Sequence, residues 1–332
     1  MRLIRARVPA GTIPGGSVVT IGKFDGLHRG HREVIATAAT VARERRLPLV
    51  VVSFEPLPDE YFAGGEAPAR LARFVSKWRL LAGLGTVDAF ACLRFDRGLA
   101  SQEPEVFAAD VLANGLGARH VVVGEEFRFG RRRRGDVALL ADAGRRHGFT
   151  VTGVPPVAAD GQRISSSRVR AALEEHRLDD AASLLGRPYR VWGRVVTGDR
   201  LGRRLGFPTA NLALGRRPPP LAGIYVVRAT GTPGGPRHGM ANVGDRPTVA
   251  GRRRLLEVYF PGFDGDLYGR ALGVDFLARL RPEERFTGLD ALTATMREDV
   301  AAGGRWLRAR GLDWRGTDRA SGNDEPGSGN EF

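Results

Sequence analysis

The sequence predicts an α/β domain built on a doubly wound parallel sheet, followed by a small antiparallel β-barrel with a C-terminal helix. In the first half of the chain, short apolar runs alternate with helical stretches, which is the βαβ rhythm of a parallel sheet. From residue 190 on, short apolar runs follow one another closely between turns rich in Gly and Pro. A long helical pattern comes only after them.

The length of the chain fits two domains. It has 332 residues, of which 42% are hydrophobic, so it can bury a full core, and domains average ~150 residues. We place the first domain at residues 1–186 and the second at residues 187–313. The remaining residues, 314–332, are polar and rich in Gly and Ser, which predicts a disordered tail.

The first half begins with an apolar strand at residues 18–21. This strand breaks at Gly22 and Gly26 and leads into a helical pattern from His31 to Arg45. In a doubly wound sheet, ligands bind at the carboxyl ends of the strands, and the turn from Gly22 to His31 lies at such an end. The same patterns predict further strands at residues 49–54, 87–93 and 120–124, and helices near residues 74–84 and 104–114.

The second half begins with a strand predicted at residues 190–196. Short apolar runs follow in quick succession between turns rich in Gly and Pro, which predicts a small antiparallel barrel. They lie at residues 224–228, 240–243, 255–260 and 272–280, and the closing helix lies at residues 289–308.

The formal net charge of +14 comes almost entirely from arginine, because lysine occurs only at Lys23 and Lys77. Positive potential attracts nucleotides and flavin phosphates as well as nucleic acid, so charge alone selects a partner class weakly. The four-arginine run at residues 131–134 is predicted to be a solvated loop. The sequence has no helix-turn-helix, RNA-recognition or zinc-finger signature, and we expect no nucleic-acid partner.

Cys92 is the only cysteine, which excludes a disulfide framework and a cysteine zinc cluster. The first 16 residues contain no apolar core of signal-peptide length, and no later run is long enough to span a bilayer. We therefore expect a soluble, cytoplasmic protein with no membrane partner.

The turn from Gly22 to His31 is a candidate phosphate site. His28 and His31 are three residues apart at a helix entrance, so both imidazoles can project to one side, beside free backbone N–H groups. Exposed amides, the helix dipole and two imidazoles suit a polyphosphate whose charge grows in the transition state. The alternatives are a metal-binding pair or two ordinary surface histidines.

A second segment fits the same site. The sequence Ile-Ser-Ser-Ser-Arg at residues 164–168 leads into a helical run, and Ser167 alone is best interpreted as an N-cap. Together with the histidines, the hydroxyls and Arg168 become candidates for binding the far phosphates of a nucleotide.

A second candidate phosphate site lies past the middle of the chain. Gly198, Gly202 and Gly206 stand among arginines and are followed by the segment Phe-Pro-Thr-Ala-Asn at residues 207–211. Thr209 and Asn211 offer hard oxygen ligands, although Asn211 can also be a simple turn residue. The Asp-Gly-Asp segment at residues 264–266 is first of all a hairpin turn, and its carboxylates could bind a metal.

Glu257 interrupts a strand that is otherwise apolar on both faces, at residues 255–260. A carboxylate in such a strand is either partnered or functional, because burying an unpaired charge is costly. The alternative to a functional role is an ion pair with an arginine of residues 252–254.

The joint order of these motifs resembles the bacterial bifunctional riboflavin kinase/FMN adenylyltransferase (FAD synthetase) family. The resemblance covers residues 17–300 and implies a Rossmann-like nucleotidylyltransferase domain joined to a riboflavin-kinase barrel. The motifs that carry it lie at residues 22–31, 127–130, 164–168, 206–211, 242–248 and 264–269.

The resemblance implies two ATP-dependent reactions. The barrel would transfer the γ-phosphate of ATP to riboflavin to form FMN, and the first domain would adenylylate FMN to FAD with release of pyrophosphate. Neither step needs a covalent intermediate, which agrees with the lack of a nucleophilic triad. Riboflavin, FMN and ATP are the implied partners and Mg²⁺ the implied metal, and a weak homo-oligomer is left open.

The resemblance also implies roles for single residues. Glu257 would be the kinase base, and His28 and His31 would act in adenylyl transfer. Thr209 and Asn211 would hold Mg²⁺, and no flavin-binding residue is implied. The residues implied to bind ATP or its phosphates are Gly22, Phe24, Asp25, Gly30, Ser166, Arg168, Gly206, Thr209 and Asn211.

Two departures from the family pattern lie in the first domain. Leu57 stands where the family has a histidine between two prolines, and Glu126 stands where the family has Asp or Asn. Loss of one stabilising donor can cost ~10²–10³ in rate. One alternative is therefore a riboflavin kinase with a degenerate first domain. A more remote alternative is a non-enzymatic flavin- or nucleotide-sensing protein.

Overall fold

We describe the protein from a computed structural model. The structure describes residues 1–63, 67–198, 201–214, 218–248 and 251–316. The chain forms two compact units: the first comprises residues 1–171 and 180–187, and the second comprises residues 172–179 and the chain from Pro188 on. The turn at residues 172–179 belongs with the barrel because Nδ1 of His176 lies 3.1 Å from the Tyr225 hydroxyl.

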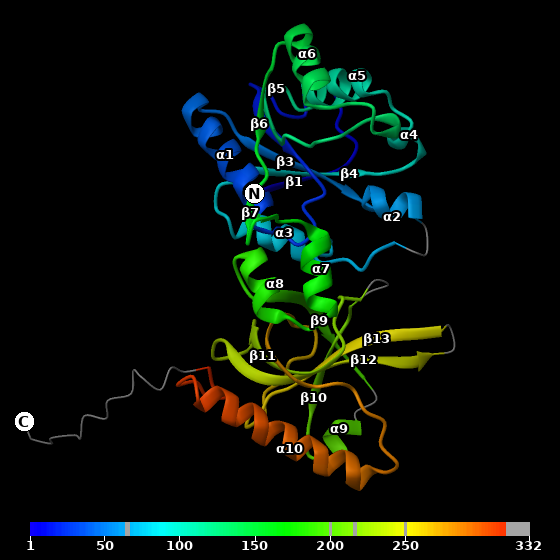
Figure 1. The fold of residues 1–332 in the computed structure, drawn as a ribbon, viewed down its shortest axis with the longest axis vertical. Coiled ribbons are helices and arrows are strands. Elements are labelled where there is room, and N and C mark those ends of the chain that lie inside the picture. The colour runs from blue at the N-terminus through cyan, green and yellow to red at the C-terminus, as the bar shows by residue number, and fades with distance from the viewer. Residues whose placement is uncertain (64–66, 199–200, 215–217, 249–250, 317–332) are drawn as a thin grey trace, which may run out of the picture. The chain divides into compact units, whose positions relative to one another are not determined.

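The first unit contains a parallel sheet, which has six strands within the described residues (Figure 1). The strand order β1-β4-β3-β2-β5-β6 changes direction at β2, as in a doubly wound sheet. This confirms the predicted fold class of the first half. The strands are β1 (Arg2–Ala6), β2 (Ser17–Ile21), β3 (Leu49–Glu55), β4 (Ala89–Arg94), β5 (Ala118–Gly124) and β6 (Thr150–Val154).

Helices cover both faces of this sheet because neighbouring strand residues point to opposite sides. Val18, Leu49 and Val51 pack under α1 (Arg29–Arg45) and α3 (Phe74–Ala82). Val19, Val50 and Val52 pack under the π-helical segment Phe107–Gly115 and α6 (Val137–His147). The shorter helices are α2 (Pro58–Ala63), α4 (Arg97–Ala100), α5 (Pro104–Val106), α7 (Ser166–Glu174) and α8 (Leu178–Leu185).

Several features of the first unit differ from the sequence prediction, among them α6 and β6, which were not predicted. Strand β1 was missed because it is an edge strand with two arginines in five residues, of which only Ile4 is buried. The predicted helix at residues 104–114 is mainly π-helical. The prediction of a solvated loop at residues 131–134 is confirmed, since all four arginines are exposed; within it, Arg131 and Arg134 each pair with Glu103 at 3.2 Å.

The second unit is a closed antiparallel barrel with the strand order β10-β13-β12-β11-β14-β9 among the described residues. This confirms the predicted barrel. A short helix, α9 (Leu201–Arg204), precedes β10. The two-stranded hairpin of β7 (Ala158–Ala159) and β8 (Gln162–Arg163) belongs to the first unit instead. The barrel strands are β9 (Tyr189–Val196), β10 (Thr209–Leu212), β11 (Gly223–Thr230), β12 (Arg237–Thr248), β13 (Gly251–Tyr259) and β14 (Ala271–Arg281).

Helix α10 (Leu289–Arg308) packs along β11, β12 and β14, as the orange helix in Figure 1 shows. The chain after it stays packed past the predicted start of the tail at residue 314, because the Trp314 carbonyl accepts a hydrogen bond from the His238 backbone N–H. Residues 317–332, where disorder was predicted, lie outside the described residues.

Two turn interpretations are wrong. Asn211 is not a turn residue, since it lies in β10 and pairs with both β9 and β13. The segment at residues 264–266 is not a hairpin tip, because it connects β13 to β14 and these strands are not neighbours in the barrel. No group of three or more His, Cys, Asp and Glu side chains in the described ranges is arranged to hold a metal ion.

Across the part of the chain that the structure describes, no helix combines the length and apolar character needed to cross a bilayer. Cys92, the only cysteine, is buried in β4 as a free thiol.

Candidate active sites

The first candidate site forms where β2 ends and α1 begins. His28 is the N-cap of α1, and its Nδ1 accepts a hydrogen bond from the His31 backbone N–H at 3.3 Å. The two imidazole rings are stacked with their centroids 3.6 Å apart. The expectation that both rings project to one side of the helix entrance is therefore confirmed.

Both imidazoles are neutral in the free protein at neutral pH. Burial, with Arg163 nearby, lowers the pKa of His28 to about 4, and burial together with the charges of His28 and Lys77 lowers the pKa of His31 well below its usual range. Because Nδ1 of His28 accepts a hydrogen bond, the proton of the neutral ring lies on Nε2. The His28 ring can therefore donate a hydrogen bond from Nε2 without carrying a charge beforehand.

The buried histidines make the first unit sensitive to acid. The pKa of His28 is lower in the folded protein than in the unfolded chain, so between pH 6.5 and pH 4 the unfolded state binds more protons and stability falls as the pH falls. We expect a loss of roughly 1.5 kcal/mol from this group between pH 6.5 and pH 5. Urea unfolding of the protein and of His28→Asn, which keeps an N-cap side chain, measures the effect. An equal pH dependence in both proteins would contradict it.

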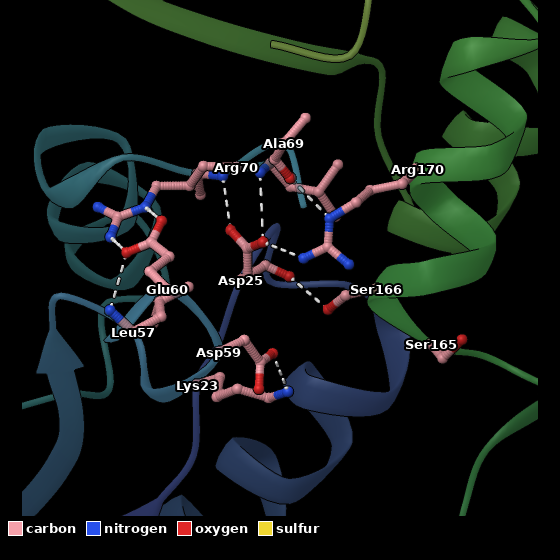
Figure 2. Close-up of polar contacts among 12 residues, drawn as sticks. Lys23, Asp25, Leu57, Asp59, Glu60, Ala69, Arg70, Ser165, Ser166 and Arg170 are labelled. Carbon is pink, nitrogen blue, oxygen red and sulfur yellow. Dashed lines mark hydrogen bonds and ion pairs between the residues drawn. The ribbon is translucent and has the colours of Figure 1, made fainter. Parts of the chain in front are cut away.

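Asp25 connects several segments around this site. Its carboxylate is buried and accepts hydrogen bonds from the backbone N–H groups of Leu71 (3.3 Å) and Ala72 (2.8 Å), and it pairs with Arg170 at 2.6 Å (Figure 2). Its carbonyl oxygen accepts from the Ser166 hydroxyl at 3.0 Å. These contacts give Asp25 a structural role in the turn, and its predicted role at the phosphate stays a prediction.

The Ile-Ser-Ser-Ser-Arg segment reaches the histidine site through Ser166, as expected, but its cap is different. Helix α7 begins at Ser166, so Ser165 is the residue whose hydroxyl accepts from the Arg168 backbone N–H, at 3.3 Å, and Ser167 is exposed. The Arg168 guanidinium donates to the carbonyls of Gln162 (2.7 Å) and Arg163 (3.1 Å) in the adjacent hairpin. In this structure Arg168 holds that hairpin.

The remaining residues of the first motif shape its walls. The buried Phe24 ring packs edge-on against His31, with 5.3 Å between centroids. A Cβ at Gly22 would lie 3.0 Å from the Phe24 ring, and one at Gly30 would lie 3.3 Å from the His28 ring. Both glycines thus allow the backbone to pass close to aromatic rings.

Lys77 belongs to this site, although the sequence analysis gave it no role. It is buried in α3, and its ammonium donates to the Lys23 carbonyl (2.5 Å) and to the Ser53 hydroxyl (2.9 Å). Burial lowers the pKa of Lys77 to about 8, opposed by the charge of Asp25. The Lys77 ammonium thus places a positive charge against the backbone of the turn from Gly22 to His31. The one sequence feature that could have pointed to Lys77 is that lysine is rare in this arginine-rich chain.

The two departures from the family pattern are also located. Leu57 is buried, and its backbone N–H donates to Glu60 Oε2 at 2.9 Å. Glu126 forms an ion pair with Arg163, and both side chains are about half exposed. Arg163 is close enough to lower the pKa of both histidines, so Glu126 holds a cation that faces the first site.

The second candidate site is a cavity of about 290 Å³ between one face of the barrel and α10. Thr209, Asn211 and Glu257, which the sequence analysis selected from two distant segments, all line it. Asn211 lies directly opposite Glu257 in the β10–β13 pair, and Glu257 lies directly opposite Asn242 in the β12–β13 pair. The barrel register therefore brings the predicted metal ligands and the predicted base together.

Glu257 shares its face of β13 with Leu255 and Tyr259, which are partly buried, while Leu256 and Val258 point to the other side and are fully buried. The alternative of an ion pair with residues 252–254 stays open, because those side chains lie outside the described residues. Gly206 is not among the cavity residues and has a φ of +84°, a conformation that glycine adopts readily, so it serves the turn before β10.

The cavity also has an apolar wall, which was not predicted. The barrel contributes Ile224 and Met240, the segment after β14 contributes Phe286, and α10 contributes Leu292, Met296 and Val300. Arg281 of β14 anchors α10 through two 2.8 Å hydrogen bonds to Asp299. Residues from several strands and one helix form this wall, so no single sequence segment shows it.

Comparison with known proteins finds a separate family for each of the two parts of the chain that contain a candidate site. Residues 11–168 match the family model of FAD synthetase, and residues 185–307 match that of riboflavin kinase. The bifunctional riboflavin kinase/FMN adenylyltransferase of Escherichia coli (strain K12) is 46% identical over 90% of this chain and 96% of its own length. The chain belongs to the bifunctional riboflavin kinase/FMN adenylyltransferase family.

Other relatives agree with this placement. The enzyme of the same description from Pseudomonas fluorescens is 46% identical over 86% of this chain and 92% of its own length. A crystal structure described as a macrolide-efflux protein from Streptococcus pneumoniae shares the fold, with a TM-score of 0.77 and 30% identity over 92% of this chain and all of that one. The histidine site lies in the segment that matches FAD synthetase, and the cavity lies in the segment that matches riboflavin kinase.

Proposed function

We propose that this chain makes FAD from riboflavin in two ATP-dependent steps, phosphorylation in the barrel and adenylylation in the first unit. The observation that carries the proposal is the cavity in which Thr209, Asn211 and Glu257 face an apolar wall. The cavity offers a carboxylate, hard oxygen ligands and an apolar surface, which suit a hydroxyl, a nucleotide and a flat ring respectively. Both family models support the two-step reading.

In the kinase step, Glu257 accepts the proton of the ribityl 5′-hydroxyl as that oxygen attacks the γ-phosphorus of ATP. The new O–P bond forms while the bond from the γ-phosphorus to the bridging oxygen breaks, so that FMN and ADP are the products. The apolar wall formed by Met296, Phe286 and their neighbours holds the flavin ring. Positioning of this kind supplies most of the catalysis in phosphoryl transfer.

In the adenylyl step, a phosphate oxygen of FMN attacks the α-phosphorus of ATP and pyrophosphate leaves. His28 and His31 donate hydrogen bonds to the phosphates from neutral rings, and the free N–H groups at the start of α1 lie beside them. These hydrogen bonds from neutral rings stabilise the negative charge that builds on the leaving pyrophosphate. Ser166, Asp25 and Lys77 hold the turn in place.

The metal of the kinase step is proposed to be Mg²⁺, held by the side-chain oxygens of Thr209 and Asn211. The fit rests on these two hard oxygens lining the same cavity as Glu257, because Mg²⁺ keeps waters and substrate phosphates as its other ligands. When bound, Mg²⁺ neutralises phosphate charge. A cytoplasmic location, where ATP is available, is part of this proposal; a weak homo-oligomer and the lack of a nucleic-acid partner stay predictions.

Incubation of the pure protein with riboflavin, ATP and Mg²⁺, followed by chromatography of the flavins, tests the proposal. We expect FMN to form first and FAD to follow. FMN without FAD would remove the adenylyl step, and formation of neither product would overturn the function as a whole.

The Glu126–Arg163 pair suggests a variant with higher adenylyl-transfer activity. Glu126→Asn removes the carboxylate that competes with phosphate for Arg163. Because both side chains are half exposed, the pair is worth at most about 1 kcal/mol, and we expect the KM for ATP in FAD formation to fall by about 2- to 5-fold. Initial rates with supplied FMN measure this, and an unchanged or raised KM would count against competition for Arg163.

A further inference from the structure

We propose that Asn242 binds the ribityl chain of the flavin substrate by accepting a hydrogen bond from a hydroxyl near the one that is phosphorylated. The inference rests on the proposed kinase function and deepens it, because it assigns a residue that recognises the polyol chain of the substrate. Asn242 lies in β12 and lines the cavity with Glu257.

The side-chain oxygen of Asn242 is buried and has no hydrogen-bond partner within the described part of the chain. Native proteins leave few buried acceptors unpaired, because each one loses its hydrogen bonds to water without replacement. An acceptor left unpaired at the wall of a substrate cavity is therefore best explained by a donor on the ligand.

The barrel register fixes where that donor lies. Asn211, Glu257 and Asn242 are directly opposite one another on the neighbouring strands β10, β13 and β12. Directly opposite residues have Cβ atoms ~4.5–5.5 Å apart on one face of the sheet. Asn242 thus stands one strand away from the candidate base, on the side opposite to the predicted Mg²⁺ ligand.

The next position in the same row is apolar. Ile224 of β11 lies directly opposite Asn242, and Met240 lies two residues before it in β12; both line the cavity. Asn242 therefore marks the boundary between a polar end with Glu257 and an apolar end. A molecule with a flat ring, a short polyol chain and a reactive terminal hydroxyl fits this order, with its hydroxyl donors at Asn242.

The test compares riboflavin with lumiflavin, which has the same ring system but no ribityl chain. Binding of each flavin to the full-length protein is titrated by flavin fluorescence for the parent protein and Asn242→Leu, a variant of similar size that lacks the acceptor. We expect the Kd for riboflavin to rise about 10-fold and the Kd for lumiflavin to stay within about 2-fold. The KM for ATP should be unchanged.

Ile224→Ala provides the matched control from the same row. This change removes apolar contact and is expected to weaken both flavins alike. Asn242→Ala serves as a second variant should the leucine side chain disturb folding. It should likewise raise the Kd for riboflavin more than the Kd for lumiflavin.

Three results overturn the role of Asn242. These are an unchanged Kd for riboflavin, an equal loss for both flavins, and a loss confined to ATP. None of them affects the proposed function, which fails separately if the parent protein forms no FMN.

Discussion

Replacing Glu257 by Gln is expected to abolish FMN formation from riboflavin while FAD formation from supplied FMN continues. Gln has the size of Glu but cannot accept the proton of the ribityl hydroxyl, and loss of a general base costs about 10²–10⁴ in rate. Glu257 lines the cavity directly opposite Asn211, so it lies beside the proposed metal and phosphate end. Initial rates with riboflavin and with FMN, each with ATP, measure the two steps separately.

Glu284→Gln is the matched control, because this carboxylate lines the same cavity but lies after β14 rather than in β13. We expect it to keep kinase activity within a few-fold of the parent protein. ATP binding should be nearly unchanged in Glu257→Gln. Kinase turnover that persists in Glu257→Gln would show that another group, or none, removes the proton.

The second large effect is expected for His31→Asn in the first unit. The change removes an imidazole that donates to the phosphates, and loss of one such donor costs about 10²–10³ in rate. FAD formation from FMN should fall by that factor, while FMN formation from riboflavin stays unchanged. The reason is that the residues proposed to bind ATP in the kinase step, Thr209 and Asn211, lie in the barrel.

His147→Ala is the control for this experiment, because His147 is exposed at the end of α6. It should leave both steps unchanged. A His31→Asn protein with normal FAD formation would remove the histidine pair from the mechanism. One that lost both reactions would indicate general damage to the fold instead.

The first site was predictable because most of its signal is local. A strand that ends at Gly22 and a helix that starts near His31 place two histidines on one side of a helix entrance, and both elements follow from short-range patterns. The stacking of the rings and the capping role of His28 are consequences of the same spacing.

The role of Asp25 was not predictable from its motif. An acidic residue inside a glycine-rich turn looks like a ligand for metal or phosphate, yet its carboxylate is bound by Leu71, Ala72 and Arg170, which are 46 to 145 residues away in sequence. Such partners are set by packing of the segments around the turn. The same limit applies to Lys77, whose contacts reach back to Lys23 and Ser53.

In the barrel, the residue types were predictable but their arrangement was not. Glu257 stood out in an apolar strand, and Thr209 and Asn211 stood out as oxygen ligands after a glycine-rich turn. Only the register of β10, β13 and β12 places Asn242 beside them, since a one-residue shift would turn its side chain to the other face. The apolar wall from α10 depends on tertiary packing alone.

The central claim is that two separate sites on one chain carry out successive reactions with FMN as the shared intermediate. The most direct test mixes Glu257→Gln and His31→Asn proteins with riboflavin, ATP and Mg²⁺ and follows the flavins by chromatography. Neither variant alone should convert riboflavin to FAD, while the mixture should do so, because FMN released by one protein is used by the other. A mixture that still fails to form FAD, when each variant retains its own partial reaction, would contradict the claim.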